Sequence, residues 1–213
     1  MSANLLINTD LAKTILTGFI HSEITRSGFS RAVIGLSGGI DSALSCVLAA
    51  EALGPENVLA VRMPYKSSSL DSLEDAQRVI EKMGVQSLTV PITEMVEPLF
   101  ERFPDANAMR RGNIMARARM IVLYDQSEAF GGLVVGTGNK TEILLGYSNL
   151  YGDSACASTR LAICTKRRYA SSRLRWASLI PSSTNPPPPT CGLVKLMRTN
   201  SVSPTKKWTS CFT

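Results

Sequence analysis

Hydrophobic positions in the first 150 residues alternate between helical and strand spacing. The first helical stripe consists of Leu11, Ile15, Leu16, Phe19 and Ile20. It predicts an N-terminal helix that Gly28 closes. The apolar run at 32–36 then predicts a short buried strand, and the apolar segment 41–53 predicts a buried helix that ends before a glycine.

The same alternation continues as far as residue 145. The further predicted strands are 58–63, 87–90 and 133–135. The further predicted helices are 73–83, 113–130 and 139–145. Strands that are separated by helices indicate an α/β fold, a doubly wound parallel sheet with helices on both faces.

The alternation stops near residue 157. Segment 181–190 reads PSSTNPPPPT, and its prolines exclude it from a helix or a sheet interior. Residues 160–180 contain apolar side chains but lack neighbouring elements that would complete a fold. We therefore predict one α/β domain at 1–157, followed by an irregular, poorly ordered tail at 158–213.

Charge divides the chain at the same place. The net charge of +6 comes from 23 Lys and Arg against 17 Asp and Glu, and ten of the basic residues lie in 158–213 with none of the acidic ones. The tail therefore carries +10 and residues 1–157 carry −4. The basic character belongs to the tail, so it does not indicate that the folded domain binds nucleic acid.

Composition also restricts the location of the protein. The N-terminal segment has Asp10, Lys13 and Glu23 within its apolar pattern, which excludes a continuous signal-peptide core, and no later run reaches the length of a membrane span. Five cysteines without paired spacing indicate reduced thiols. We expect a cytoplasmic protein with no membrane contact, in which Cys46 packs inside a buried helix.

The segment IGLSGGIDSA, residues 34–43, carries the first chemical signal. A strand delivers Ser37-Gly38-Gly39 to the start of a helix, where free backbone N–H groups and a partial positive charge favour phosphate. Asp41 would repel a polyphosphate unless a cation lay between them, so we interpret it as a Mg²⁺ ligand. The alternative is that Asp41 only caps the helix.

The motif S-G-G-I-D-S resembles the pyrophosphatase (PP) loop of ATP-dependent adenylating enzymes. Two later segments, RGNIMARARMIVLYD at 111–125 and VVGTGNKTEILLGYSNLYGDSA at 134–155, resemble the NAD synthetases, and the resemblance covers about 11–157. It implies the Rossmann-like fold of the adenine nucleotide alpha hydrolases. It also implies conversion of nicotinic acid adenine dinucleotide (deamido-NAD) to NAD, in which ATP adenylates the carboxylate and ammonia displaces AMP.

The resemblance also implies roles for individual residues but assigns no catalytic side chain beyond the ATP and metal site. The residues that would hold the ATP phosphates are Gly35, Leu36, Ser37, Gly38, Gly39, Ile40, Asp41 and Ser42. Thr137 would contact ATP, Glu142 would be the second metal carboxylate, and Arg117 would contact deamido-NAD. Arg62, at the end of a predicted strand, is a weaker ATP candidate.

Each of these residues also has a purely structural interpretation. Thr137 is alternatively a loop cap, and Glu142 an ordinary acid in the first turn of a helix. Arg117 and Arg119 are alternatively a solvated helix face, and this interpretation is stronger for Arg119.

The resemblance further implies a homodimer that pairs through helices including 113–130. About thirty residues precede the first predicted strand, so we expect free ammonia, or ammonia from a separate chain, as the nitrogen donor. Two alternatives remain: another PP-loop adenylating enzyme, of the GMP synthetase or tRNA-modifying kind, or a non-catalytic remnant. Such a remnant would bind ATP, or bind nucleic acid non-specifically through its basic tail.

The tail is compatible with a shifted reading frame. Codons can be chosen for STRLAICTKRRYA, residues 158–170, that encode LNPIGDLYKTQVR when they are read one base earlier, and this is the text with which the family continues. Segments 185–192 and 196–208 convert in the same way. We therefore expect that 158–213 is a frameshifted product, that ATP–Mg²⁺ binds weakly and that NAD formation is greatly reduced. The alternative is a genuine basic extension.

Overall fold

A computed structural model of the chain describes residues 8–157, which form a parallel four-stranded sheet with the order β3-β2-β1-β4. The strands are β1 (Ala32–Gly35), β2 (Val58–Arg62), β3 (Gln86–Thr89) and β4 (Leu133–Val134). Ala32 of β1 pairs with Val58 on one side and with Leu133 on the other. The predicted sheet is confirmed, and the predictions for the tail at 158–213 lie outside the described residues.

Six α-helices accompany the strands within the described residues. They are α1 (Thr9–Arg26), α2 (Ile40–Leu53), α3 (Leu70–Met83), α4 (Thr93–Arg102), α5 (Ala108–Phe130) and α6 (Lys140–Leu145), and a short 3₁₀ helix η1 (Pro55–Asn57) follows α2. Helix α4 was not predicted from the sequence; it contains Pro98 and buries only Val96 and Phe100. The predicted helix 113–130 begins too late, because α5 starts at Ala108, where Asn107 caps it by accepting a hydrogen bond from the Arg110 amide.

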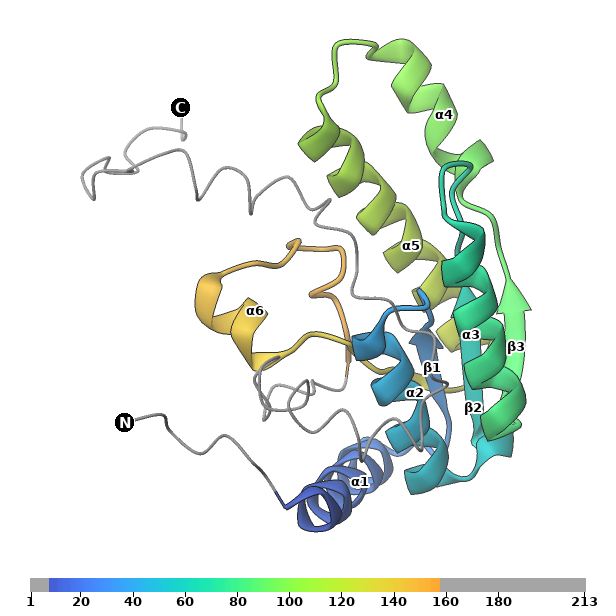
Figure 1. Cartoon of the computed structure of the whole chain (residues 1–213), viewed down its shortest axis with the longest axis vertical. Coiled ribbons are helices and arrows are strands. Elements are labelled where there is room, and N and C mark those ends of the chain that lie inside the picture. The colour runs from blue at the N-terminus through green and yellow to red at the C-terminus, as the bar shows by residue number, and fades with distance from the viewer. Residues whose placement is uncertain (1–7, 158–213) are drawn as a thin grey trace, which may run out of the picture.

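The helices cover both faces of the sheet, as predicted (Figure 1). Side chains alternate along β1, so that Ala32 and Ile34 pack in a core with α1, α2 and α3. Val33 points the other way, into a second core that contains Ala118 and Val122 of α5 and parts of α4. The sheet therefore separates α2 from α5, and both helices lie against β1.

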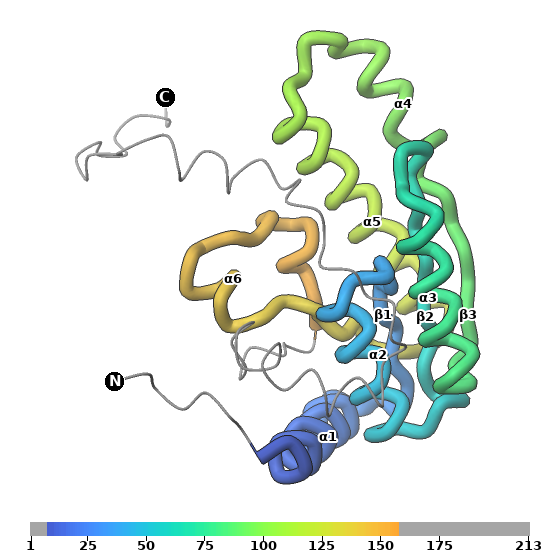
Figure 2. Tube along the Cα trace, in the orientation of Figure 1, coloured from blue at the N-terminus to red at the C-terminus, as the bar shows by residue number. Residues whose placement is uncertain are grey.

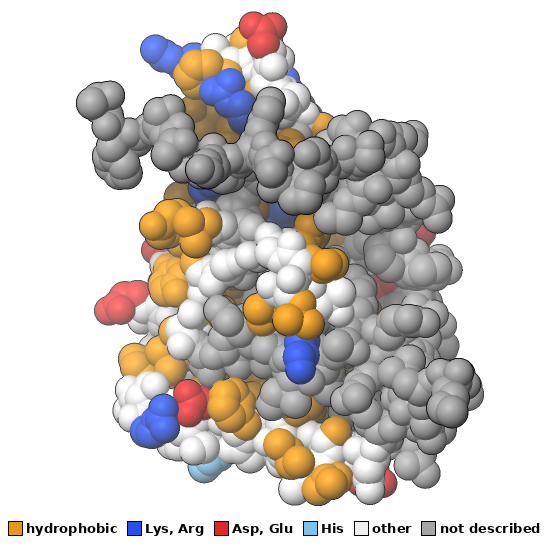
Figure 3. All heavy atoms as spheres, turned by 90° about the vertical axis from the view of Figure 1, so that its left-hand side faces the viewer, with side chains coloured by type: hydrophobic (Ala, Val, Ile, Leu, Met, Phe, Trp, Pro, Cys, Tyr) orange, Lys and Arg blue, Asp and Glu red, His pale blue; other side chains and the backbone are white. Residues whose placement is uncertain are grey.

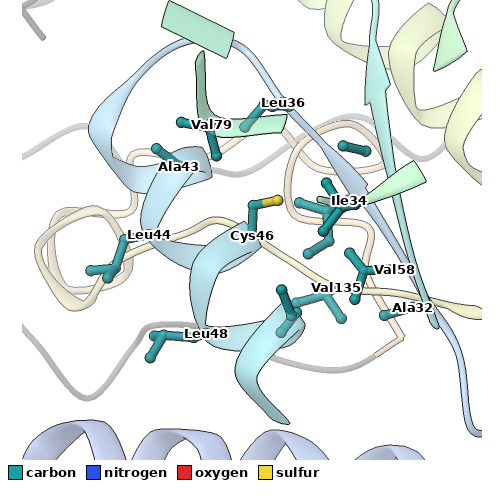
Figure 4. Close-up of a cluster of buried hydrophobic side chains, with 14 of the residues drawn as sticks. Ala32, Ile34, Leu36, Ala43, Leu44, Cys46, Leu48, Val58, Val79 and Val135 are labelled. Atoms are coloured by element: carbon teal, nitrogen blue, oxygen red, sulfur yellow. The ribbon is translucent and has the colours of Figure 1, made fainter. Parts of the chain in front are cut away.

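The larger core is built around α2. Every residue of α2 from Ser42 to Ala50 is buried, because α1, α3 and the sheet surround this helix. Figure 4 shows the Cys46 side chain pointing from α2 toward Ile34 of β1. Burial raises the pKa of the Cys46 thiol to about 12, in agreement with the packing role predicted for it.

After β4 the chain leaves the sheet, and α6 and the loop behind it form a separate arm (Figure 2). This arm returns to the sheet edge, where the Ala157 amide donates to the Val134 carbonyl. Its exposed apolar side chains are Ile143, Leu144, Leu145, Leu150 and Tyr151. Hydrophobic side chains also gather on the face of the molecule shown in Figure 3, the side on which α6 lies. Within the described residues, no helix has both the length and the apolar character needed to cross a membrane.

Candidate functional site

The candidate site lies at the carboxyl ends of β1 and β4. The chain winds from β1 through β2 to β3 in one direction and then crosses back to place β4 on the other side of β1. In open α/β sheets, ligands bind where the strand order reverses in this way. The loop 36–39 after β1 and the loop 135–139 after β4 both leave the sheet at this point.

The loop after β1 is held by two serines. The Ser42 hydroxyl, in the first turn of α2, donates to the Gly39 carbonyl at 2.9 Å and accepts from the Ser37 amide at 3.2 Å. The Ser37 and Ser42 hydroxyl oxygens lie 3.0 Å apart. These bonds fix a short loop at the N-terminus of a buried helix, with Gly38 at a φ of +80°. The amides of Leu36, Ser37 and Gly39 donate within the protein, so the backbone N–H groups that favour an anion here are those of the first turn of α2.

A cavity of about 380 Å³ opens in front of this loop. Its lining residues are Gly35, Leu36, Ser37, Ser42, Met63, Pro64, Ser68, Ser69, Ser72, Leu73, Arg119, Leu123, Thr137 and Asp153. Five of these, Gly35, Leu36, Ser37, Ser42 and Thr137, were predicted as ATP-binding residues. The remaining residues of the predicted phosphate loop, Gly38, Gly39, Ile40 and Asp41, lie in the same turn but outside the lining.

The start of α3 forms a second wall of the cavity. This wall was not predicted from the sequence. Ser69 caps α3 by accepting a hydrogen bond from the Ser72 amide, and the two hydroxyl groups are also hydrogen-bonded at 2.8 Å. Two helix N-termini, those of α2 and α3, therefore meet at one cavity. The cluster of serines at 67–69, in the loop between a strand and a helix, was the available sequence signal for this wall.

Asp41 lies in the first turn of α2 and is half-buried. A carboxylate beside a phosphate-binding loop suits Mg²⁺, which commonly combines one or two carboxylates with phosphate oxygens. Within 8–157, no group of three or more His, Cys, Asp and Glu side chains is arranged to hold a metal ion. The residues present therefore fit an ion whose ligands come mainly from a polyphosphate, rather than an ion that is bound by protein side chains alone.

Glu142 has a clear structural role in α6. Asn139 caps this helix through its side-chain oxygen, which accepts from the amides of Thr141 and Glu142. In return, the Glu142 carboxylate accepts from the Asn139 amide at 3.0 Å, which completes a capping box. Glu142 therefore acts as an acid in the first turn of α6, which was the alternative to a role as a metal ligand. Its metal role stays a prediction.

The two arginines predicted together on α5 lie in different environments. Arg117 is exposed and does not belong to the lining of the cavity described above. Arg119 is half-buried, lines the cavity and donates from Nε to the Met63 carbonyl at 3.2 Å. Burial lowers the pKa of Arg119. The sequence favoured a solvated helix face more strongly for Arg119 than for Arg117, so Arg119 was not predicted as a lining residue.

Arg62, the weaker ATP candidate, is half-buried at the end of β2. Its Nη1 donates to Gln77 Oε1 at 2.7 Å, and the Gln77 amide nitrogen in turn donates to Glu81 at 2.7 Å. Its Nε is buried without a hydrogen-bond acceptor among the described residues. Gln77 of α3 therefore holds the guanidinium, Arg62 does not belong to the lining of the cavity, and its ATP role stays a prediction.

The loop between β2 and α3 is anchored to α4 by Glu97. The Tyr65 hydroxyl donates to Glu97 at 2.5 Å, and Lys66 forms an ion pair with the same carboxylate at 2.8 Å. Hydrogen bonds from Lys66 and then from Tyr65 hold the pKa of Glu97 below its ordinary value. Because Pro64 and Ser68 line the cavity, this anchor sets the position of the cavity wall.

Comparison with known proteins places this site in a family. The model of the NAD synthase family matches residues 13–202. Among curated proteins, the NH₃-dependent NAD⁺ synthetase of Trichlorobacter lovleyi is 59% identical over 155 residues, which is 73% of this chain and 57% of that protein. The NH₃-dependent NAD⁺ synthetase of Chlorobaculum parvum is 52% identical over 154 residues, 72% of this chain and 56% of that protein.

Solved structures give the same family. The NH₃-dependent NAD synthetase of Campylobacter jejuni has a TM-score of 0.72 at 34% identity and covers 82% of this chain and 77% of its own. The glutamine-dependent NAD⁺ synthetase of Acinetobacter baumannii, solved with ADP, has a TM-score of 0.74 at 32% identity, over 88% of this chain and 38% of its own. The chain spans a little more than half the length of the curated relatives named above. On its sequence and its fold, the chain belongs to the NAD synthase family.

Proposed function

We propose that the chain carries out the ATP-dependent amidation of deamido-NAD to NAD, with ammonia as the nitrogen donor and AMP and pyrophosphate as the other products. The observation that supports this most directly is the phosphate loop at 36–39, at the N-terminus of α2 and at the reversal of the strand order. Its serine hydroxyls and glycines suit a triphosphate, and the adjoining cavity provides room for the reacting groups.

The reaction divides into two displacements. The nicotinate carboxylate attacks the α-phosphorus of ATP, a P–O bond to pyrophosphate breaks, and an acyl adenylate forms. Ammonia then attacks the acyl carbon, the bond to AMP breaks, and the excess proton leaves to solvent. Residues 35–42 would hold the phosphates of ATP, Thr137 would contact ATP, and Arg117 would contact deamido-NAD.

Mg²⁺ completes this proposal as a partner of the ATP phosphates. Asp41, and Glu142 as the second carboxylate, would hold the ion. When it is bound, Mg²⁺ neutralises charge on the phosphates and so favours departure of pyrophosphate.

We also propose a cytoplasmic homodimer that pairs through α5. This helix carries exposed apolar side chains, Ile121 and Tyr124 among them, which an isolated chain would leave in water. Sedimentation equilibrium of the full chain checks this, and a monomer at micromolar concentration would contradict it.

The test of the proposed function is turnover by the full chain with deamido-NAD, ATP–Mg²⁺ and ammonium, with NAD and AMP measured separately. Equal amounts of both products identify the reaction, whereas AMP release with a different acceptor would favour another adenylating enzyme. The expectation that the tail impairs turnover stays a prediction. If calorimetry detects ATP affinity that is the same with and without Mg²⁺ and in Asp41→Ala, the metal assignment is wrong.

A further inference from the structure

Arg119 is the arginine that reaches the cavity from α5, on the face of the sheet opposite α2. Its neighbours in the sequence, Ala118 and Val122, pack into the core between α5 and the sheet, which fixes the rotation of the helix. The Nε atom donates to the Met63 carbonyl, at the carboxyl end of β2. The guanidinium thereby lines the same cavity as Ser37 and Ser42 of the loop before α2.

Arg119 forms no ion pair within the described part of the chain. No carboxylate in residues 8–157 forms an ion pair with it, and the Met63 carbonyl is the acceptor for Nε alone. Asp153, the one carboxylate among the lining residues, is not paired with Arg119, and its Oδ1 accepts a hydrogen bond from the Asn149 amide. A partly buried cation without an ion-pair partner is unfavourable, and an anion bound in the cavity would stabilise it.

We infer that Arg119 binds phosphate oxygens of the nucleotide in this cavity. This inference rests on the proposed function, which supplies the nucleotide. The N–H groups at the start of α2 hold the phosphates from one face of the sheet, and the Arg119 terminal nitrogens approach them from the other face. A guanidinium suits this place because it keeps its charge when it is partly buried and presents two parallel donors to one phosphate group.

Binding of adenosine, AMP and pyrophosphate tests this assignment, measured by calorimetry on the full chain and on Arg119→Gln. Loss of a charge-assisted pair predicts that affinity for AMP, for pyrophosphate or for both falls roughly tenfold or more. Adenosine has no phosphate, so its affinity should stay the same. The anion that is affected identifies which part of the nucleotide Arg119 contacts.

The controls separate charge from structure. Arg110→Gln removes an exposed arginine from the same helix, whose guanidinium lies over the Phe103 ring, and it should change none of the three affinities. Arg119→Lys keeps the charge without the two parallel donors and should recover part of the anion affinity. If Arg119→Gln does not fold, Arg119→Lys carries the test, with at least a roughly threefold loss of anion affinity expected.

Three results would overturn the inference. Unchanged anion affinity in Arg119→Gln, or in Arg119→Lys where that variant carries the test, would contradict it and leave the proposed function intact. An equal loss for adenosine and for the two anions would show that Arg119 only supports the cavity wall. Absence of AMP and pyrophosphate binding by the unaltered chain would overturn both the inference and the nucleotide site.

Discussion

Gly38 and Ser72 lie so close together that a Cβ on Gly38 would stand 2.1 Å from the Ser72 carbonyl oxygen. Gly38 belongs to the phosphate loop before α2, and Ser72 belongs to the first turn of α3. The φ of Gly38 is +80°, a region that side chains with a Cβ rarely adopt. The contact of these two backbones joins the two helix N-termini at the cavity, and it requires glycine for both steric and conformational reasons.

Gly38→Ala should therefore move the phosphate loop away from α3. We expect a loss of about 2 to 4 kcal/mol in the free energy of unfolding, together with loss of ATP affinity. Urea denaturation and calorimetric titration measure the two effects. Gly28→Ala is a matched control because Gly28 has a φ of +82° and no atom within 4 Å of its added Cβ.

In the control, only the strain of the positive φ remains. We expect the Gly28→Ala variant to lose about 1 to 2 kcal/mol in the free energy of unfolding and to keep its ATP affinity. Equal stability and equal affinity in the two variants would contradict a special role for the contact between Gly38 and Ser72.

Cys46 provides a prediction about alkaline pH. Its pKa is raised from 9.0 to about 12 by burial in the folded chain. Above pH 9 the unfolded chain loses the thiol proton while the folded chain keeps it, so stability falls between pH 9 and about 12. At pH 10.5 the loss due to this thiol is about 2 kcal/mol.

The Cys46→Ala variant isolates that effect. It should be less stable than the unaltered chain at pH 7, because it leaves a small cavity, and the difference should shrink or reverse above pH 10. A thiol reagent should label the same number of cysteines in both folded chains, but one fewer in the unfolded variant. Labelling of Cys46 in the folded chain would contradict its buried position.

Most of the fold could be predicted from the sequence because β1, β2 and α2, which form its centre, are largely apolar. The run at 32–36 and the buried helix 41–53 allow no competing interpretation as surface segments. Helix α4 was missed because Pro98 weakens the helical pattern and only two of its residues are buried. Its position depends instead on contacts with β2 and α5 that are distant in the sequence.

The candidate site was predicted less completely, and for a geometric reason. Residues two apart on a helix point to nearly opposite sides, so Arg117 and Arg119 cannot both face one cavity. The sequence predicts the helix, but the rotation of α5 is set by how Ala118 and Val122 pack against the sheet. The serines of α3 were missed because their contact with the phosphate loop depends on the pairing of β1 with β2.

Glu97 should control the loop that lines the cavity. In Glu97→Ala the hydrogen bond from Tyr65 and the ion pair with Lys66 are both lost. We expect faster amide exchange at 64–69 and severalfold weaker ATP binding, measured by mass spectrometry and calorimetry. Glu101→Ala, an exposed acid on the same helix, is the control and should change neither quantity.

The anchor should also depend on acid pH. The pKa of Glu97 is lowered in the folded chain, so its contribution is complete above the ordinary pKa of 4.5 and is lost as pH falls through the lowered value. Amide exchange at 64–69, corrected for its intrinsic pH dependence, should therefore rise below this window in the unaltered chain but not in Glu97→Ala. The same exchange profile in both chains would contradict the anchor.

The basic, acid-free segment 158–213 leads to a prediction about the gene. Sequencing of the coding DNA should reveal an in-register continuation of the family sequence that is displaced by one base near codon 158. A repaired gene should then give a chain with higher ATP affinity and faster NAD formation. Coding DNA without such a displaced continuation would support the alternative of a genuine basic extension.

Glu142 allows the capping and metal roles to be separated in one comparison. Glu142→Gln keeps an oxygen that can accept from the Asn139 amide, so the capping box and the stability of α6 should be preserved. It removes the negative charge, so the enhancement of ATP affinity by Mg²⁺ should fall if Glu142 is a metal ligand. Asn139→Ala removes the cap instead and should cost about 1 kcal/mol of stability. Unchanged Mg²⁺ dependence in Glu142→Gln would leave Glu142 with its structural role alone, and Asp41 as the remaining carboxylate for the ion.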